Sequence, residues 1–262
     1  MIGLDVGITN TDLVVVEGGK IKFSMNSPSR KGVAKKLLSL VPSSSGEDIA
    51  ITGAGAKKEA GEIGNRKIIF IDEISAIGIG GSKLAGLSRC VVASIGTGTA
   101  IVKVDGRKCE HVGGTGVGGG TIVGLGKRLL DVIDAEKIAG LASKGKLEKI
   151  NITVGDVYGK GVGIVPPDAT AANFAKLKGA SKPDLALGIL DLVGETAGVL
   201  ACFAAREAKV QDIVFVGAVP TLEGMPWVLK RTAEMFGFRA VILEEARFST
   251  AFGAAVCAER RD

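Results

Sequence analysis

The sequence predicts an α/β protein with two lobes that face each other across a central cleft. Residues 2–26 carry three consecutive strand patterns joined by turns, and alternating helix and strand patterns follow them. Residues 89–114 carry a second set of three strands that opens in the same order of strand, glycine turn and strand. This repetition indicates an internal duplication, so we expect one lobe at 1–86 and the other at 87–262.

After its meander, the first lobe continues with helix and strand patterns in alternation. Apolar residues at helical spacing mark the helices, and short apolar runs that end at glycine turns mark the strands. The expected helices cover 31–41, 57–64 and 73–86, the expected strands cover 48–55 and 67–72, and Pro42–Gly46 is expected to form a short loop.

The second lobe repeats this order with more helices. Its expected helices cover 118–133, 135–143, 168–178, 185–208 and 226–236, with a last one from Phe248, and its expected strands cover 212–218 and 240–245. Each lobe is therefore expected to be built on a βββαβαβα unit.

Composition argues against several classes of protein. With 262 residues, 46% of them hydrophobic, the chain is long enough to bury a sizeable core. Its net charge of +5 is spread over short basic pairs such as Lys35-Lys36, Lys57-Lys58 and Arg260-Arg261, so we expect no nucleic-acid partner. Acidic residues interrupt the apolar stretch 185–205, which predicts a buried helix and no membrane partner.

The cysteines and the start of the chain bear on its compartment. Cys90, Cys109, Cys202 and Cys257 show no metal-ligand spacing, so we expect free thiols and no zinc site. The chain opens on a strand-like stretch instead of a secretion signal. Both features lead us to expect a cytoplasmic protein.

Residues 112–126 contain eight glycines just before a helical pattern. A dinucleotide fingerprint fits Gly114, Gly116 and Gly119, but the preceding strand is weak and the expected acidic residue does not follow. A Walker A loop fails at Arg128. Two interpretations remain open for the triplet 118–120, a phosphate cradle at a helix N-terminus and close packing of the helix.

Two further turns favour the phosphate interpretation. Residues 3–12 and 94–100 place glycines and hydroxyl groups in the first turn of each meander, where two facing hairpins could grip the phosphates of a nucleotide. Asp5, at the end of the first strand, is suited to hold Mg²⁺ through water. The side chains expected to donate hydrogen bonds are those of Thr9, Asn10, Thr11, Thr97 and Thr99.

These stretches resemble the superfamily of actin, sugar kinases and heat-shock ATPases, and within it the type II pantothenate kinases. The resemblance covers nearly the whole chain and is carried by GLDVGITNT, IGTGTAIVKVDG, VGGTGVGGGTIVGLG, PPDATAANFAKL and FSTAFGAA. It implies a two-lobed actin-like ATPase fold, related to ribonuclease H, with ATP and Mg²⁺ in the central cleft. The implied activity is transfer of a phosphoryl group from ATP to a hydroxyl of pantothenate, the first step of coenzyme A biosynthesis.

The catalytic residue that the resemblance implies is Glu73, whose carboxylate follows a strand and begins a helix. It could accept the proton of the substrate hydroxyl. Asp72 is its rival, and a helix-capping role is the alternative for either acid.

The resemblance also implies which residues contact the ligands. Those expected at the nucleotide are Asp5, Gly7, Thr9, Asn10, Thr11, Gly96, Thr97, Gly98, Gly118, Gly119, Gly120, Thr121, Gly217 and Ser249. Those expected at the acceptor are Thr99, His111, Gly113, Gly114, Thr170 and Ala171, although Thr170 could instead cap the helix expected after it.

Four positions depart from the family pattern, one of which is Ala135 in place of a tyrosine near the nucleotide. Ile8 stands where the family has a second glycine, and Asp12 stands where it has a lysine that reaches the phosphates. A carboxylate there repels polyphosphate unless a metal lies between them, so Asp12 either binds Mg²⁺ or turns away. His111 replaces an arginine that grips pantothenate, and a neutral imidazole cannot form the same clamp, so the acceptor could differ or bind weakly. The alternative is a structural histidine on a strand.

Three functions follow from these observations. The leading one is an ATP-dependent kinase for pantothenate or a similar small molecule, with a homodimer through the long helix near 187–205 and regulation by acyl-CoA implied by the resemblance. The second is an ATPase that activates a partner enzyme, against which the scattered cysteines argue. The third is a protein that binds a nucleotide or coenzyme A and has lost catalysis.

Overall fold

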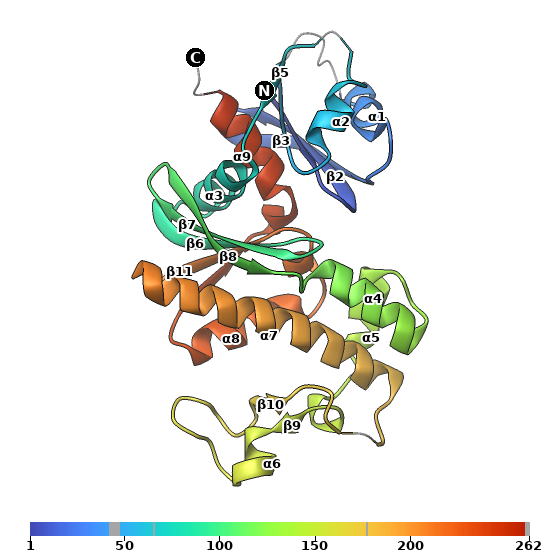
Figure 1. Ribbon diagram of the computed structural model, residues 1–262, viewed down its shortest axis with the longest axis vertical. Helices are drawn as coiled ribbons and strands as arrows, with labels where there is room; N and C mark the ends of the chain where they lie inside the picture. Colours follow the sequence, from blue (N-terminus) through green and yellow to red (C-terminus); the bar gives the residue numbers. More distant parts are fainter. Residues whose placement is uncertain (42–47, 65, 177, 260–262) are drawn as a thin grey trace.

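Two five-stranded sheets with the same topology form the frame of the molecule (Figure 1). The computed structural model describes residues 1–41, 48–64, 66–176 and 178–259. The predicted loop Pro42–Gly46 and the basic pair Arg260-Arg261 lie outside these residues. The first sheet has the order β3-β2-β1-β4-β5 and the second the order β8-β7-β6-β11-β12, so the predicted duplication is confirmed.

The first unit follows the predicted order of elements. Its strands are β1 (Ile2–Val6), β2 (Asn10–Glu17), β3 (Lys20–Pro28), β4 (Ile49–Thr52) and β5 (Ile68–Phe70). Its helices are α1 (Val33–Ser39), α2 (Ala56–Ala60) and α3 (Glu73–Leu84). All four residues of β4 are buried because helices cover both faces of this sheet.

The second unit repeats this order and has additional elements between its helices α5 and α7. Its strands are β6 (Arg89–Ile95), β7 (Thr99–Asp105), β8 (Lys108–Thr115), β11 (Asp212–Val216) and β12 (Arg239–Ile242). Its helices are α4 (Gly119–Leu130), α5 (Ala135–Ala142), α7 (Lys182–Ala208), α8 (Met225–Met235) and α9 (Ser249–Ala258), with the short 3-10 turns η2 (Val219–Thr221) and η3 (Glu244–Phe248).

The segment between α5 and α7 differs from the prediction. It contains η1 (Leu147–Lys149), β9 (Ile152–Thr153), α6 (Val154–Tyr158) and β10 (Thr170–Ala172), with β9 and β10 paired antiparallel. The predicted helix 168–178 is therefore wrong where the structure describes it. Thr170 lies in a strand instead of capping a helix, and Phe174 has a φ of 57°, which no helix accommodates.

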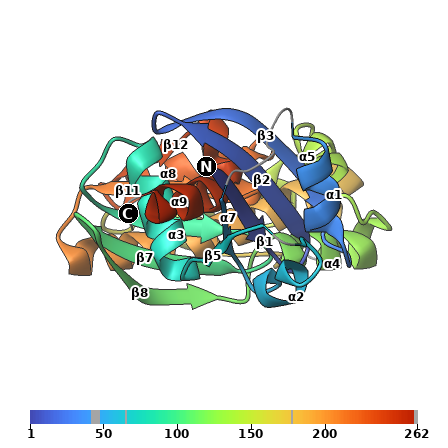
Figure 2. The same cartoon turned by 90° about the horizontal axis from the view of Figure 1, so that it is seen from above.

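Helices α3 and α9 lie between the two sheets and join them (Figures 1 and 2). Helix α3, from the first unit, packs on the second sheet, whereas α9, from the end of the chain, packs on the first sheet. The two helices cross so closely that a Cβ on Gly253 would lie 1.9 Å from the Ala76 oxygen, and one on Gly80 would lie 2.0 Å from the Ser249 oxygen. Glycine is required here because backbone packs directly on backbone.

Helix α7 is long and apolar enough to cross a membrane by length and composition alone. In this fold 61% of its most apolar stretch is buried, and it packs on the second sheet and α8. A capping box at its start explains why it begins at Lys182, since the Ser181 hydroxyl accepts from the Asp184 amide and Asp184 accepts from the Ser181 amide.

We predict that Gly253→Ala destabilises the protein by about 1–3 kcal/mol, because a methyl group forces α3 and α9 apart. Gly140→Ala is the matched control, since Gly140 lies in α5 with nothing within 4 Å of the added Cβ. The control should be stabilising by up to about 1 kcal/mol through helix propensity. Urea unfolding measures both, and equal effects of the two substitutions would contradict this account of the crossing.

Candidate active site

The two glycine hairpins meet directly across the junction of the sheets. The β1–β2 turn and the β6–β7 turn are 88 residues apart in the chain, yet the Thr9 Oγ1 and Thr97 Oγ1 atoms form a hydrogen bond of 2.9 Å. Both threonines are exposed to solvent, so their hydroxyls remain accessible to a ligand. The structure therefore brings together the two turns that the sequence places at the phosphates.

The N-terminus of α4 lies against the second hairpin. The Gly119 amide donates to the Gly96 oxygen at 2.7 Å, and the Gly120 amide donates to the Thr97 oxygen at 2.9 Å. A Cβ on Gly118 would lie 2.7 Å from the Thr97 oxygen. The glycines thus serve close packing. The positive end of the helix dipole points to the same turn, and phosphate binding at this helix end stays a prediction.

Several of the predicted hydroxyl donors already have partners inside the protein. Thr11 is buried and its Oγ1 lies 2.9 Å from the Ser29 Oγ. Thr99 is 7% exposed and donates to the Val117 oxygen at 2.8 Å. Thr121 Oγ1 accepts from the Gly118 amide at 3.2 Å, which closes the first turn of α4. Thr9 and Thr97 are thus the threonines of the two hairpins that face solvent, and the nucleotide contacts of the others stay predictions.

Two carboxylates lie side by side behind the first hairpin. Asp5 and Asp12 are directly opposite each other in the β1–β2 register, and Asp12 accepts a bond of 2.7 Å from Asn26 Nδ2. Burial, followed by repulsion from Asp12 and Glu73, raises the pKa of Asp5 to about 7. Burial also raises the pKa of Asp12 to about 6, against the opposing effects of the Asn26 bond and Arg247. This region of the cleft therefore favours a cation or a proton.

The structure separates the roles of the neighbouring acids Asp72 and Glu73. Asp72 caps α3, because its carboxylate accepts from the Ser75 amide at 2.9 Å and from the Ser75 hydroxyl at 3.0 Å. Glu73 reaches solvent and lines a pocket of about 270 Å³ together with Thr52, Gly53 and Lys57. Partial desolvation and the charge of Asp72 raise the pKa of Glu73, which suits a proton acceptor.

Two residues expected at the nucleotide lie where β11 and η3 adjoin. Gly217 has a φ of 96°, and its amide donates to the Ala246 oxygen at 2.9 Å. Ser249 is fully buried, and its Oγ has no hydrogen-bond partner within the described chain. The nucleotide contacts of both residues stay predictions.

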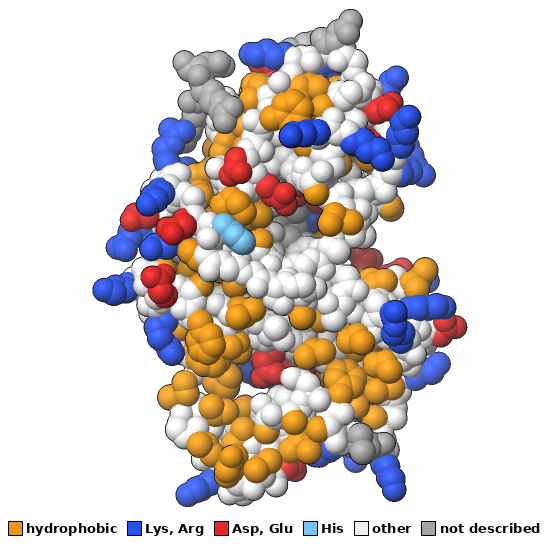
Figure 3. All heavy atoms as spheres, viewed as in Figure 1, with side chains coloured by type: hydrophobic (Ala, Val, Ile, Leu, Met, Phe, Trp, Pro, Cys, Tyr) orange, Lys and Arg blue, Asp and Glu red, His pale blue; other side chains and the backbone are white. Residues whose placement is uncertain are grey.

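The residues expected at the acceptor divide into two groups. His111, Gly113 and Gly114 lie on β8, and His111 is exposed. Figure 3 shows a hollow where the two halves of the molecule meet, with acidic side chains above it and the single histidine at its edge. Thr170 and Ala171 instead lie on β10, at the end of the molecule remote from the first sheet (Figure 1).

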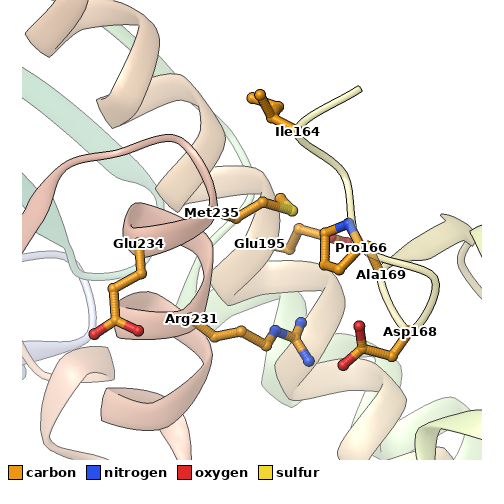
Figure 4. A pocket seen from close by; sticks show the side chains of 8 residues that line it. All are labelled: Ile164, Pro166, Asp168, Ala169, Glu195, Arg231, Glu234 and Met235. Atoms are coloured by element: carbon orange, nitrogen blue, oxygen red, sulfur yellow. The ribbon is translucent and has the colours of Figure 1, made fainter. Parts of the chain in front are cut away.

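Sequence reasoning missed a polar network beneath the β9–β10 ribbon. Asp191 is fully buried in α7 and accepts hydrogen bonds from Arg231 at 2.5 Å, Asn151 at 3.1 Å and Thr170 at 3.2 Å. Figure 4 shows the adjacent pocket of about 370 Å³, into which Arg231 and Asp168 point toward each other. The sequence signal was an acidic residue inside an apolar helix, which requires a buried partner.

We predict that Asp5→Asn removes the part of a pH-dependent loss of stability that Asp5 causes in the protein free of nucleotide and Mg²⁺. The raised pKa means that folded Asp5 holds its proton more tightly than unfolded Asp5, so stability falls as pH rises from about 4 through about 7. The free energy of unfolding of the variant minus that of the wild type should be larger at pH 8 than at pH 4, by on the order of 2–4 kcal/mol. Urea unfolding across this range checks it, and a constant difference would refute it.

Comparison with known proteins supports the family suggested by the motifs. The Fumble family matches residues 85–238. The type II pantothenate kinase of Staphylococcus haemolyticus is 31% identical over 79% of this chain and 82% of its own. The type II pantothenate kinase of Bacillus cereus is 30% identical over 83% of each chain.

Solved structures share the fold at low sequence identity. Component A of the (R)-2-hydroxyglutaryl-CoA dehydratase of Acidaminococcus fermentans superposes with a TM-score of 0.69 at 19% identity, covering 100% of this chain and 98% of its own. A ROK family glucokinase from Streptomyces griseus, solved with glucose and AMPPNP, gives 0.66 at 14% identity and 99% coverage of both. The predicted actin-like fold is confirmed, and the chain belongs to the Fumble family of type II pantothenate kinases.

Proposed function

We propose that this protein is an ATP-dependent kinase that transfers the γ-phosphoryl group of ATP to a hydroxyl of pantothenate. The observation that carries the proposal is the Thr9 to Thr97 contact, which places both glycine hairpins at one point of the cleft. Glu73 lies on the rim of the same region, within electrostatic reach of Asp5. The relatives named type II pantothenate kinase support the choice of acceptor.

In this proposal, the hydroxyl oxygen of the acceptor attacks the γ-phosphorus of ATP while the Glu73 carboxylate accepts the hydroxyl proton, and ADP leaves. Phosphoryl transfer depends mainly on positioning and charge stabilisation, and the hairpins supply amide and hydroxyl donors for the phosphate oxygens. The raised pKa of Glu73 brings its basicity closer to what proton transfer near neutral pH requires.

The carboxylates behind the first hairpin fit a magnesium ion. The Asp5 carboxylate accepts no hydrogen bond from the described residues, and its burial beside Asp12 makes a nearby cation favourable. Mg²⁺ binds through one or two carboxylates together with substrate phosphates and waters, so Asp5 would hold it through water. When bound, the ion would neutralise charge on the transferred phosphoryl group.

The acceptor side of the site is proposed to be completed by a second copy of the chain. Within one chain, β10, which carries Thr170 and Ala171, lies at the end of the molecule remote from α3, which begins at Glu73 (Figure 1). The segment between β9 and β10 exposes large apolar side chains at Tyr158, Val162 and Ile164. A homodimer that buries this region would allow the ribbon of one copy to reach the acceptor of the other. Sedimentation equilibrium should give twice the mass of 26.7 kDa, and a monomer at micromolar concentration would contradict it.

The acceptor, the compartment and the regulation also belong to this proposal. The exposed His111 cannot clamp a carboxylate as a guanidinium does, so we propose other small hydroxyl compounds as candidate acceptors beside pantothenate. We place the reaction in the cytoplasm, with acyl-CoA as its regulator. A screen with labelled ATP decides the acceptor, and ATP hydrolysis that ignores all small acceptors would favour an ATPase that activates a partner enzyme.

We predict that Glu73→Gln lowers kcat with pantothenate by about 10²–10⁴-fold while leaving the KM for ATP within a few-fold, because it removes a proton acceptor and no phosphate ligand. Asp72→Asn is the matched control one position away. Because asparagine caps a helix about as well as aspartate, this variant should keep both the α3 cap and most of the activity. Steady-state ADP formation measures both variants, and an equal loss of kcat in the control would remove Glu73 from its role.

A further inference from the structure

The cleft carries an excess of negative charge on the side of the first hairpin. Asp5, Asp12 and Glu73 lie close enough for their charges to interact, and none of them has an ion pair within 4.0 Å among the described residues. A nucleotide polyphosphate adds several further negative charges at this place. Beside the Mg²⁺ proposed above, a positive side chain from another element in the cleft would therefore favour binding.

The turn η3 is placed to supply that side chain. It contacts β2 of the first sheet and β11 of the second, and its Ala246 oxygen accepts from the Gly217 amide at 2.9 Å. It directly precedes α9, the helix that lies between the sheets. The side chains of η3 therefore lie at the junction of both sheets.

Arg247 is the cation of this turn, and its surroundings leave its guanidinium available. Its side chain is 24% exposed. Within the described chain it forms one ion pair, with 3.8 Å between the Arg247 Nη2 and Glu136 Oε1 atoms, and the Glu136 side chain is 80% exposed. A pair of this length between an exposed acid and a partly exposed base contributes little to stability. Arg247 also acts electrostatically on Asp12, and the turn η3 contacts β2, the strand that carries Asp12.

We propose that Arg247 binds the polyphosphate of the nucleotide and thereby offsets the carboxylate of Asp12. The inference rests on the proposed function only in taking the nucleotide to lie between the two hairpins. A planar guanidinium offers paired donors that match phosphate oxygens, so a short shift from Glu136 exchanges a weak ion pair for charge-assisted hydrogen bonds. Asp12 stays tied to Asn26 and does not have to leave the cleft.

Calorimetric titration of the full-length protein with ATP, ADP, AMP and adenosine tests this inference without any acceptor. Arg247→Gln is expected to lower the affinity for ATP by about 10- to 100-fold, because it removes hydrogen bonds to a charged group, and to change the affinity for adenosine less than about twofold. Arg247→Lys should recover part of the loss, because it restores the charge without the fork. Arg128→Gln on α4 is the matched control, since that exposed arginine donates to the Gly124 oxygen outside the cleft.

An equal loss of affinity for adenosine and ATP, or no loss for either, would overturn the inference. Should Arg247→Gln fold poorly, Asp12→Asn/Arg247→Gln removes the unbalanced carboxylate together with the arginine. If Arg247 contacts phosphate, the double variant should bind ATP at least about tenfold more weakly than Asp12→Asn alone. Equal binding by the two variants would overturn the inference, because Arg247 would then serve only to neutralise Asp12. Because binding is measured directly, a protein that binds ATP but phosphorylates no acceptor would contradict the proposed function and leave this result intact.

Discussion

The meeting of two backbone hairpins at the junction of two sheets is the constraint on which the site depends. The Thr9 and Thr97 hydroxyls come within hydrogen-bonding distance only if the sheets approach closely, and the sheets approach closely only if α3 and α9 cross at backbone contact. Gly80 and Gly253 permit that crossing. A few side-chain-free positions in the interior therefore determine the geometry of the surface at which phosphates would bind.

Electrostatics explains why this junction suits a charged ligand. The carboxylates of Asp5 and Asp12 are held close together by the register of β1 and β2, and burial makes their ionised forms costly. A cation near them recovers part of this cost. The free protein is thus less stable near neutral pH than its packing alone would allow, and a ligand that brings positive charge restores the difference.

Much of the fold and of the candidate site could be predicted from local patterns in the sequence. The duplicated meanders and the glycine turns are short-range signals. The Asp72 cap is another, because it explains why α3 begins at Glu73. The prediction of a helix at 168–178 was wrong because residues 170–172 form a strand. Hydrogen bonds with Asn151 and Asp191, from distant parts of the chain, hold Thr170 in that strand. Helix α3 of the first unit packs on the second sheet, and α9 of the second unit packs on the first sheet. This packing and the electrostatic effect of Arg247 on Asp12 depend on tertiary contacts that no local pattern encodes.

Hydrogen exchange of the backbone amides, compared with and without a non-hydrolysable ATP analogue and Mg²⁺, tests the central claim most directly. A nucleotide held between the hairpins should slow exchange in residues 7–10 and 96–98 together, at the same ligand concentration. Protection of one hairpin without the other, or of neither while the analogue binds, would contradict it.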